Sequence, residues 1–260
     1  MDGPVVMKAD ERRRHILELA RRVGHVAVFD VAGQLDISPE TVRRDLKLLE
    51  EHGLLRRTHG GAYPIDKAGF ETTVSQSSEL LLPQKRRIAV AAAGMVNDAE
   101  TLYVDEGFTP GLVAEELTRK GRRLTVVTSS LSAAETLASV TSVSVILLGG
   151  RVRAGSLATV DHWATSMLSD LVIDLAILGT NGVSIDRGLT TPDPSVSAVK
   201  RKVVEVSRRR VMVGVHTKFG FNSFCKFADV ADFESIVTDT GLSVRIAHRY
   251  AALGPEVIRA

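Results

Sequence analysis

One segment of the chain carries residue types that are suited to reading DNA bases. Residues 38–46 have the sequence Ser-Pro-Glu-Thr-Val-Arg-Arg-Asp-Leu. At 100° per residue, an apolar stripe runs along one side of the helix that this segment begins. The opposite side carries polar residues, namely Glu40, Arg43, Arg44 and Lys47, with Thr41 at its edge. Because an arginine fork can donate to both O6 and N7 of one guanine, the pattern predicts base contacts in the major groove.

Three short amphipathic helices are expected to position this polar face. Their apolar residues recur at helical spacing: Ile16, Leu17 and Ala20 in the first, Val28, Val31, Ala32 and Leu35 in the second, and Val42, Leu46 and Leu49 in the third. Ser38 can cap the third helix, and Pro39 suits its first position, where no N–H is required. A short turn at 36–37 separates the last two helices, as in a helix-turn-helix, whose second helix enters the major groove.

A basic hairpin is expected to follow the third helix. Residues 54–58 are typical of a short strand and residues 59–62 of a tight turn. Such a wing would place Arg56, Arg57 and His59 near backbone phosphate, and residues 12–14, all arginine, can add further phosphate contacts. A simpler alternative stays open, in which the three helices bind another protein and the arginines are merely exposed.

From Lys85 onward, apolar strands alternate with amphipathic helices. Strands are expected at 101–104, 124–128, 143–148, 175–178, 211–215 and 235–238, and helices at 88–96, 111–120, 131–139, 161–169, 195–208 and 242–253. This alternation is typical of a parallel, Rossmann-like sheet that is covered on both faces. We therefore expect an α/β protein with a winged helix-turn-helix domain at 8–63, a linker at 64–84 and an effector-sensing and oligomerisation domain at 85–260.

Polar and glycine-rich segments fall at the carboxyl ends of the expected strands, where parallel sheets bind ligands. The candidate effector-binding residues are Asp105, Glu106, Gly107, Phe108, Thr109, Gly149, Gly150, Arg151, Arg153, Asn181 and Lys218. The turn that opens the helix near 111 offers free N–H groups to a phosphate, and Asp105 and Asn181 can bind sugar hydroxyls. Simpler explanations stay open: the glycines can serve only to turn the chain, Asp105 can cap a helix, and Arg151 and Arg153 can meet a partner subunit.

Composition excludes several classes of protein. The 260 residues are 44% hydrophobic and 25% charged, with a net charge of +2, as in a globular protein with a substantial core. The single cysteine, Cys225, permits no disulfide within one chain, and a reducing, cytoplasmic setting is expected. The seven histidines lack metal-ligand spacing and no dinucleotide or phosphate-loop motif occurs, so no metal or other cofactor is predicted. No signal peptide or apolar run of about 20 residues is found, and no membrane partner is expected.

Several motifs together resemble those of DeoR-family transcriptional regulators. They are the segment 38–46, Leu-Leu-Arg-Arg-Thr-His-Gly-Gly-Ala at 54–62, Gly-Thr-Asn-Gly at 179–182, Gly-Leu-Thr-Thr-Pro-Asp at 188–193 and Lys-Phe-Gly at 218–220. The family implies a winged helix-turn-helix followed by a sugar-phosphate-sensing domain similar in fold to ribose-5-phosphate isomerase. It also implies a repressor of carbohydrate-metabolism genes that a phosphorylated metabolite controls. Two-fold operator sites in double-stranded DNA need paired reading heads, so a homodimer or homotetramer is expected.

Three positions depart from the family's usual pattern. Phe108 stands where a Ser or Thr is usual, Val215 where an Asp is common, and Asp161 where a Gly is common. These changes leave open a regulator with a ligand other than a phosphosugar, or a second domain that serves only oligomerisation. An isomerase-like enzyme is a further alternative, but Asp105, Glu106 and Asp161 do not form a complete acid–base constellation. We therefore predict no enzyme and no catalytic residue.

Overall fold

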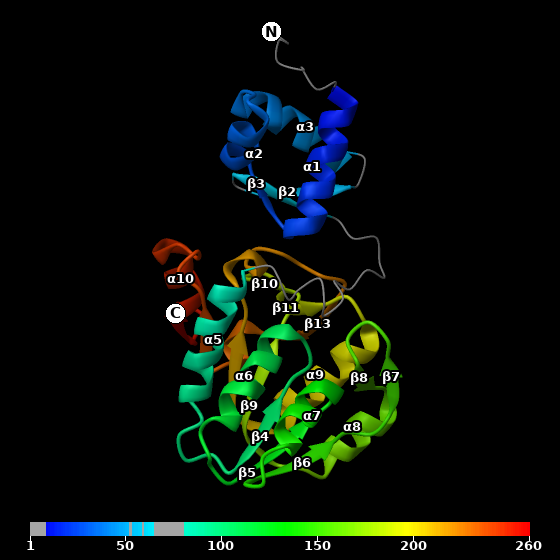
Figure 1. Cartoon of the computed structure of the whole chain (residues 1–260), viewed down its shortest axis with the longest axis vertical. Coiled ribbons are helices and arrows are strands. Elements are labelled where there is room, and N and C mark those ends of the chain that lie inside the picture. Colours follow the sequence, from blue (N-terminus) through cyan, green and yellow to red (C-terminus); the bar gives the residue numbers. More distant parts are fainter. Residues whose placement is uncertain (1–8, 52–53, 59, 65–80) are drawn as a thin grey trace. The chain divides into compact units, whose positions relative to one another are not determined.

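The computed structural model describes residues 9–51, 54–58, 60–64 and 81–260. The chain divides into two compact units, Met1–Phe70 and Glu71–Ala260, and Figure 1 labels their helices and strands. The linker expected at 64–84 falls mostly outside the described residues. Its last three residues are helical, because helix α5 begins at Leu82.

In its described residues, the first unit contains three helices and a small antiparallel sheet. The elements are α1 (Ala9–Val23), β1 (Val26–Ala27), α2 (Val28–Leu35), α3 (Pro39–Glu51), β2 (Leu55–Thr58) and β3 (Gly61–Pro64), with strand order β1-β3-β2. The apolar stripes expected from the sequence meet in one core, with Ile16, Val42 and Leu55 fully buried. The tight turn is shorter than expected, because Gly61 and Ala62 already belong to β3 and pair with β1 and β2.

A buried carboxylate links two helices of this unit. The side chain of Asp45 in α3 is 3% exposed. It accepts hydrogen bonds from Nε of Arg12 at 2.6 Å and Nε of Arg13 at 3.1 Å. The expected phosphate contacts of Arg12 and Arg13 are therefore at odds with the structure, which uses both guanidinium groups to hold α1 against α3.

The second unit is built on a parallel sheet of seven strands in the order β15-β14-β12-β9-β4-β5-β6. Their bounds are β4 (Thr101–Val104), β5 (Leu124–Thr128), β6 (Val143–Leu147), β9 (Ile173–Gly179), β12 (Ser207–Val213), β14 (Ser235–Thr238) and β15 (Glu256–Arg259). The helices are α5 (Leu82–Gly94), α6 (Phe108–Thr118), α7 (Leu131–Ala138), α8 (His162–Ser169), α9 (Pro194–Val206) and α10 (Val244–Ala251). This arrangement confirms the α/β fold expected from the alternation of strands and helices.

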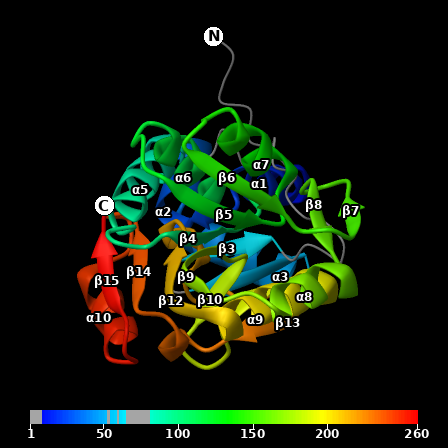
Figure 2. The same ribbon diagram turned by 90° about the horizontal axis from the view of Figure 1, so that it is seen from below.

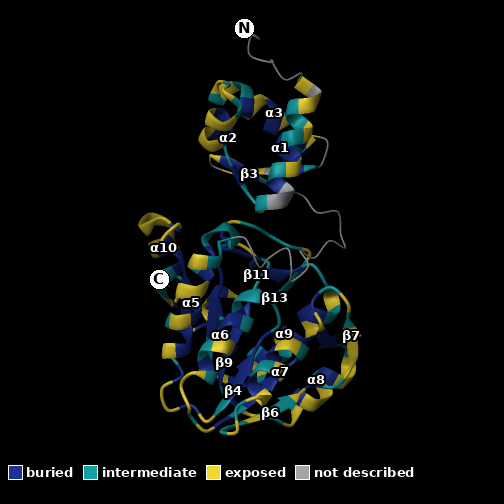
Figure 3. Ribbon diagram, viewed as in Figure 1, coloured by how far each residue is buried: buried dark blue, intermediate teal, exposed yellow. Residues whose placement is uncertain are grey.

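Helices cover both faces of the sheet, as Figure 2 shows. Successive strand residues point to opposite faces. Leu102 therefore packs in the core beneath α5, α6 and α7, while its neighbour Tyr103 packs in the core beneath α8, α9 and α10. Strands β4 and β9 are buried on both sides (Figure 3), so their carboxyl ends are held rigidly within the fold.

The sequence prediction missed the short antiparallel elements. A hairpin joins β7 (Arg151–Arg153) to β8 (Ala158–Val160), and a second sheet has the order β10 (Gly182–Ser184), β11 (Gly188–Thr191), β13 (Cys225–Ala228). These strands have three or four residues each, too few for an alternation to show. β12 begins four residues earlier than expected. Its first four residues, Ser-Arg-Arg-Arg, are polar, and the sequence prediction counted only the apolar residues that follow them. Among the described residues, no helix is long and apolar enough to cross a membrane.

We predict that Asp45→Ala destabilises the first unit by roughly 1.5–3 kcal/mol, because two guanidinium groups lose their shared buried acceptor. Amide hydrogen exchange of the full chain should speed up in peptides from α1 and α3. Peptides from β9, in the second unit, serve as the internal control and should keep their rates. Unchanged exchange in α1 and α3 would show that the ion pairs contribute nothing to the fold.

Candidate DNA interface and effector pocket

The start of α3 has the geometry that a helix-turn-helix requires. Helix α2 ends at Leu35, and its C-cap, Asp36, has φ 50° and ψ 49°. The hydroxyl of Ser38 accepts the N–H of Thr41 at 3.2 Å, and the two hydroxyls lie 2.9 Å apart. Ser38 is therefore the cap of α3 and Pro39 its first residue, as the sequence predicts.

The polar side of α3 is exposed along its length. Glu40, Arg43, Arg44 and Lys47 are all exposed. Arg43 lies 3.2 Å from Glu40, and Lys47 lies 3.8 Å from Glu51. In the described part of the chain, the side chain of Arg44 has neither an ion pair nor a hydrogen bond, so its donors remain available to a ligand.

Of the three basic wing residues expected to contact DNA, the structure describes the side chain of only one, Arg57. Arg57 in β2 donates its backbone N–H and its Nε to the carboxylate of Glu50, at 2.9 and 2.7 Å. That ion pair fixes β2 against α3 and partly neutralises Arg57. The side chain of Arg56 and the whole of His59 lie outside the described residues.

In the second unit, a cavity of about 110 Å³ lies at the carboxyl ends of β4, β9 and β12. It brings together six of the residues expected to bind an effector: Glu106, Gly107, Phe108, Thr109, Asn181 and Lys218. Helix α6 begins at Phe108, three residues earlier than expected, so Gly107 is its N-cap, with φ 102°. Four polar residues that sequence reasoning missed also line this cavity: Lys85, Ser156, Thr180 and Lys200.

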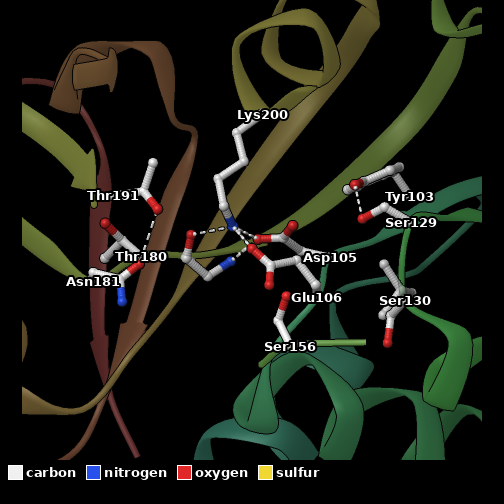
Figure 4. A network of polar contacts seen from close by, with 12 residues as sticks. Tyr103, Asp105, Glu106, Ser129, Ser130, Ser156, Thr180, Asn181, Thr191 and Lys200 are labelled. Atoms are coloured by element: carbon white, nitrogen blue, oxygen red, sulfur yellow. Dashed lines mark hydrogen bonds and ion pairs between the residues drawn. The ribbon is translucent and has the colours of Figure 1, made fainter. Parts of the chain in front are cut away.

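A buried ion pair lies next to this cavity, which Lys200 lines and Asp105 does not; Figure 4 shows its contacts. The ammonium of Lys200 in α9 contacts Asp105 and lies 3.4 Å from Glu106 and 3.3 Å from the carbonyl oxygen of Gly179. The N–H of Gly179 donates to Oδ2 of Asp105 at 2.8 Å. Lys200 and Asp105 are 3% and 1% exposed. The network joins the ends of β4 and β9 to α9.

The electrostatics of the pair follow from its burial. Burial raises the pKa of Asp105 to about 6, against the opposing charge of Lys200. Oδ1 of Asp105 is buried and has no hydrogen-bond partner among the described residues, which adds to the cost of its charge. Burial alone would lower the pKa of Lys200, but Asp105 and Glu106 raise it above its ordinary value. Both partners are therefore charged at neutral pH.

The burial of Lys200 could have been predicted from its position in the sequence. Val196, Val199 and Val203 form the buried stripe of α9, and Lys200 occupies a position within that stripe. A lysine is rarely fully buried unless it is paired. A lysine at an apolar position of a helix therefore predicts a buried carboxylate opposite it.

Asn181 and Thr180 are already engaged by the small second sheet. Thr191 donates its hydroxyl to Oδ1 of Asn181 at 3.1 Å. The hydroxyl of Thr180 lies 2.8 Å from the carbonyl of Gly182 and 3.0 Å from that of Thr190. These bonds fix the segment that follows β9 and leave the amide nitrogen of Asn181 as its donor toward a ligand.

The structure separates the remaining candidates from this cavity. Gly149, Gly150 and Arg151 line a different hollow with Asp161, Trp163 and Met167. Gly150 has a conformational reason to be glycine: its φ is 132°, and a Cβ there would lie 2.3 Å from the carbonyl oxygen of Val160. Arg153 forms an ion pair at 3.2 Å with Asp193, the residue that caps α9. The expectation that all these residues converge on one pocket is therefore wrong.

One of the unusual positions, Asp161, lies away from this cavity, whereas Phe108 and Val215 line it. Asp161 has φ 83° and caps α8 by accepting the N–H of Trp163 at 3.4 Å, so its carboxylate belongs to the other hollow. Val215 is buried in the core at the start of the turn 216–218 that carries Lys218. His216 fixes this turn by donating its N–H to Asp239 at 2.7 Å, with Nδ1 2.6 Å from the same carboxylate. Burial alone would raise the pKa of Asp239, but these bonds lower it.

Comparison with known proteins agrees with this division into a DNA-reading unit and a pocketed unit. Residues 12–68 match the model of the DeoR-like helix-turn-helix domain, and residues 82–240 match that of the DeoR C-terminal sensor domain. The chain belongs to the DeoR family. The transcriptional regulator GlpR of Haloferax volcanii is 33% identical over 95% of this chain and 96% of its own length. The glycerol-3-phosphate regulon repressor of Escherichia coli is 31% identical over 90% and 92%.

The names of these relatives describe transcriptional regulation. They are named as a transcriptional regulator and a repressor, as expected for a DNA-binding protein that is not an enzyme. Among solved structures, ribose-5-phosphate isomerase A of Neisseria gonorrhoeae is similar at 18% identity over 52% of each chain, with a TM-score of 0.39. Within the described residues, no group of three His, Cys, Asp or Glu side chains could hold a metal ion.

We predict that Lys200→Met destabilises the second unit by about 3–5 kcal/mol, because Asp105 is left as a buried carboxylate without its cation. The double variant Lys200→Met/Asp105→Asn should recover most of that loss. Urea unfolding at pH 7, followed by far-UV circular dichroism, measures both. The double variant being less stable than the single one would show that the two side chains do not act as a pair.

Proposed function

We propose that this protein is a cytoplasmic repressor of carbohydrate-metabolism genes that leaves its operator when a small phosphorylated metabolite binds the second unit. One observation carries the effector class: three lysines, Lys85, Lys200 and Lys218, line the cavity at the strand ends. Glu106 is the one carboxylate among its described lining residues, and it already lies 3.4 Å from Lys200. The excess of lysine over carboxylate among the described lining residues suits an anion such as a phosphate.

The DNA contacts are assigned from exposure and position. The residues proposed to face DNA are Ser38, Glu40, Thr41, Arg43, Arg44 and Lys47 on α3, and Arg56, Arg57 and His59 on the wing. Arg44 is the proposed base reader, because its five donors are unused within the described structure. The wing residues are proposed to contact phosphate, which carries no sequence information.

A repressor of this kind needs two reading heads. Operators with two-fold symmetry are read by paired helices set about one turn of DNA apart. We therefore propose that the chain acts as a homodimer or homotetramer. The effector would then favour one arrangement of the heads over another, since a ligand shifts an equilibrium only by its differential affinity for the two states.

We predict that Arg44→Ala weakens specific binding about tenfold to hundredfold, the value of one good bidentate base contact. The DNA is a fragment that the wild-type chain selects from a random duplex pool, and affinity is measured by fluorescence anisotropy at fixed salt. Arg245→Ala, on the exposed surface of α10, is the matched control and should bind as wild type. Binding of the selected fragment by Arg44→Ala at wild-type affinity would remove Arg44 from the interface.

The effector is predicted to be found among phosphorylated polyols and sugars. One relative is named for the glycerol-3-phosphate regulon, so glycerol 3-phosphate is the first probe, with glycerol as the uncharged control. Glycerol 3-phosphate should raise the melting temperature of the full chain and release the selected DNA, and Lys218→Ala should abolish both effects. Phosphorylated polyols and sugars that neither stabilise the chain nor release DNA would leave only the oligomerisation role.

A further inference from the structure

The exposed apolar side chains of the second unit are concentrated in one segment of the chain. Among the described residues, eleven large apolar side chains are exposed, and six of them lie between residues 147 and 172. This segment contains the end of β6, the hairpin β7–β8, helix α8 and the turn before β9. A concentration of exposed apolar surface marks a site that binds a partner. The six residues are Leu147, Val152, Leu157, Trp163, Met167 and Val172.

Two elements of this segment meet in one hollow of about 400 Å³. Trp163 and Met167, four positions apart on α8, line it together with Asp161 and residues 149–151 at the start of the hairpin. The N–H of Gly149 donates to Sδ of Met167 at 3.1 Å, which joins α8 to the chain that leaves β6. Trp163 is 62% exposed, so a large indole ring lies mostly in water. The residues that line this hollow are named the α8 face.

The α8 face lacks the charges that normally cover an exposed helix. The sequence of α8, His-Trp-Ala-Thr-Ser-Met-Leu-Ser, contains no Asp, Glu, Lys or Arg. The five other helices described in the second unit each contain at least one of these residues. At the centre of a protein–protein interface, charged residues are depleted and Trp and Met are enriched. The composition of α8 therefore indicates an interface.

The two edges of the parallel sheet differ in the same way. At one edge, β15 begins with Glu256 and ends with Arg259. At the other edge, β6 has the sequence Val-Ser-Val-Ile-Leu, without a charge, and its one partner among the described strands is β5. An edge strand that is not protected by charge pairs readily with another chain unless something covers it. The unprotected edge is thus the one that the α8 face follows in sequence.

The charges at the hollow favour a second copy of this chain as the partner. Nε of Arg151 lies 3.9 Å from Oδ2 of Asp161, near the limit of an ion pair, and both side chains are partly exposed. In a two-fold contact, each residue of one copy meets its counterpart's neighbour twice, once from each side. Arg151 of one copy can therefore pair with Asp161 of the partner subunit in two equivalent places. With one charge of each sign, the α8 face is complementary to itself.

We propose that the α8 face is a two-fold contact between two copies of this chain. Trp163 and Met167 are buried at its centre, and Arg151 pairs with Asp161 of the partner subunit. This inference rests on the proposed function, which requires paired reading heads, and it assigns the surface that pairs them. The α8 face and the cavity at the strand ends share no lining residue, so association and effector binding use separate surfaces.

Trp163 is the single tryptophan of the sequence, so its fluorescence reports directly on this contact. The full chain is studied over a dilution series, with its mass measured by sedimentation velocity and its emission recorded in parallel. As the assembly dissociates, Trp163 emission should move to longer wavelength and acrylamide quenching should increase, because the indole becomes exposed to water. Both changes should have the same midpoint as the fall in mass. Emission that stays constant while the mass halves would overturn the inference.

Substitutions on the face test the apolar centre. Met167→Lys should weaken association at least about thirtyfold, as for a central residue of an interface. At concentrations where wild type is associated, its mass should be half that of wild type and its Trp163 emission that of the diluted wild type. Trp163→Lys, at a largely exposed position, should halve the mass as well and serves if Met167→Lys does not fold by circular dichroism. Val90→Lys, the same change at an exposed apolar position of α5, is the matched control and should keep the wild-type mass and emission.

A charge reversal tests the self-complementary pair. Arg151→Glu sets two carboxylates against each other in both equivalent places and should weaken association about tenfold at low salt and less at high salt. Arg245→Glu, a charge reversal at an exposed position of α10, is the control and should associate as wild type. Equal association of Arg151→Glu and wild type at low salt would overturn the assigned charge pair.

Binding of the selected DNA fragment separates this inference from the proposed function. Met167→Lys should bind the fragment at least about tenfold more weakly than Val90→Lys, because the two heads are no longer linked before they meet DNA. A folded Met167→Lys variant with wild-type mass, or one of halved mass with wild-type DNA affinity, would overturn the inference and leave the repressor intact. A wild-type chain that selects no fragment from the random pool would overturn the proposed repressor, whereas mass and emission would still test the contact.

Discussion

The ion pair between Asp105 and Lys200 is the constraint on which the second unit depends. It joins the carboxyl ends of β4 and β9 to α9 where both side chains are almost fully buried. A buried charge is tolerated only when it is paired and hydrogen-bonded. The pair therefore fixes the two strand ends and α9 relative to one another. These elements also supply residues to the wall of the cavity.

The same pair also fixes the charge distribution next to the cavity. Lys200 holds two carboxylates, those of Asp105 and Glu106, on one side of it. The hairpin β7–β8 adds to this arrangement. Its Arg153 bonds both Ser156, which lines the cavity, and Asp193, which caps α9. Arg153 thereby links α9, which carries Lys200, to the turn between β7 and β8, which carries Ser156.

The fold and the reading face could be predicted from sequence because local patterns determine them. Helical spacing in α3 places Val42 inward and Arg44 outward without reference to the rest of the chain. The errors arose where a residue's role depends on a distant partner. Arg12 pairs with Asp45, 33 positions along the chain, and Lys200 pairs with Asp105, 95 positions away. Gly149 and Arg151 follow a strand end as expected, but a hairpin too short to leave a pattern carries them into another hollow.

The arrangement also makes Asp105 unsuited to general acid or base catalysis. A general acid or base must reach the substrate and exchange a proton with it. Oδ2 of Asp105 accepts from both Lys200 and the backbone of Gly179, and the whole side chain is 1% exposed. Releasing it for proton transfer would leave the Lys200 ammonium buried without its principal counter-ion. The energetic cost of that separation keeps the pair closed, so its contribution is a fixed connection between the ends of β4 and β9 and helix α9.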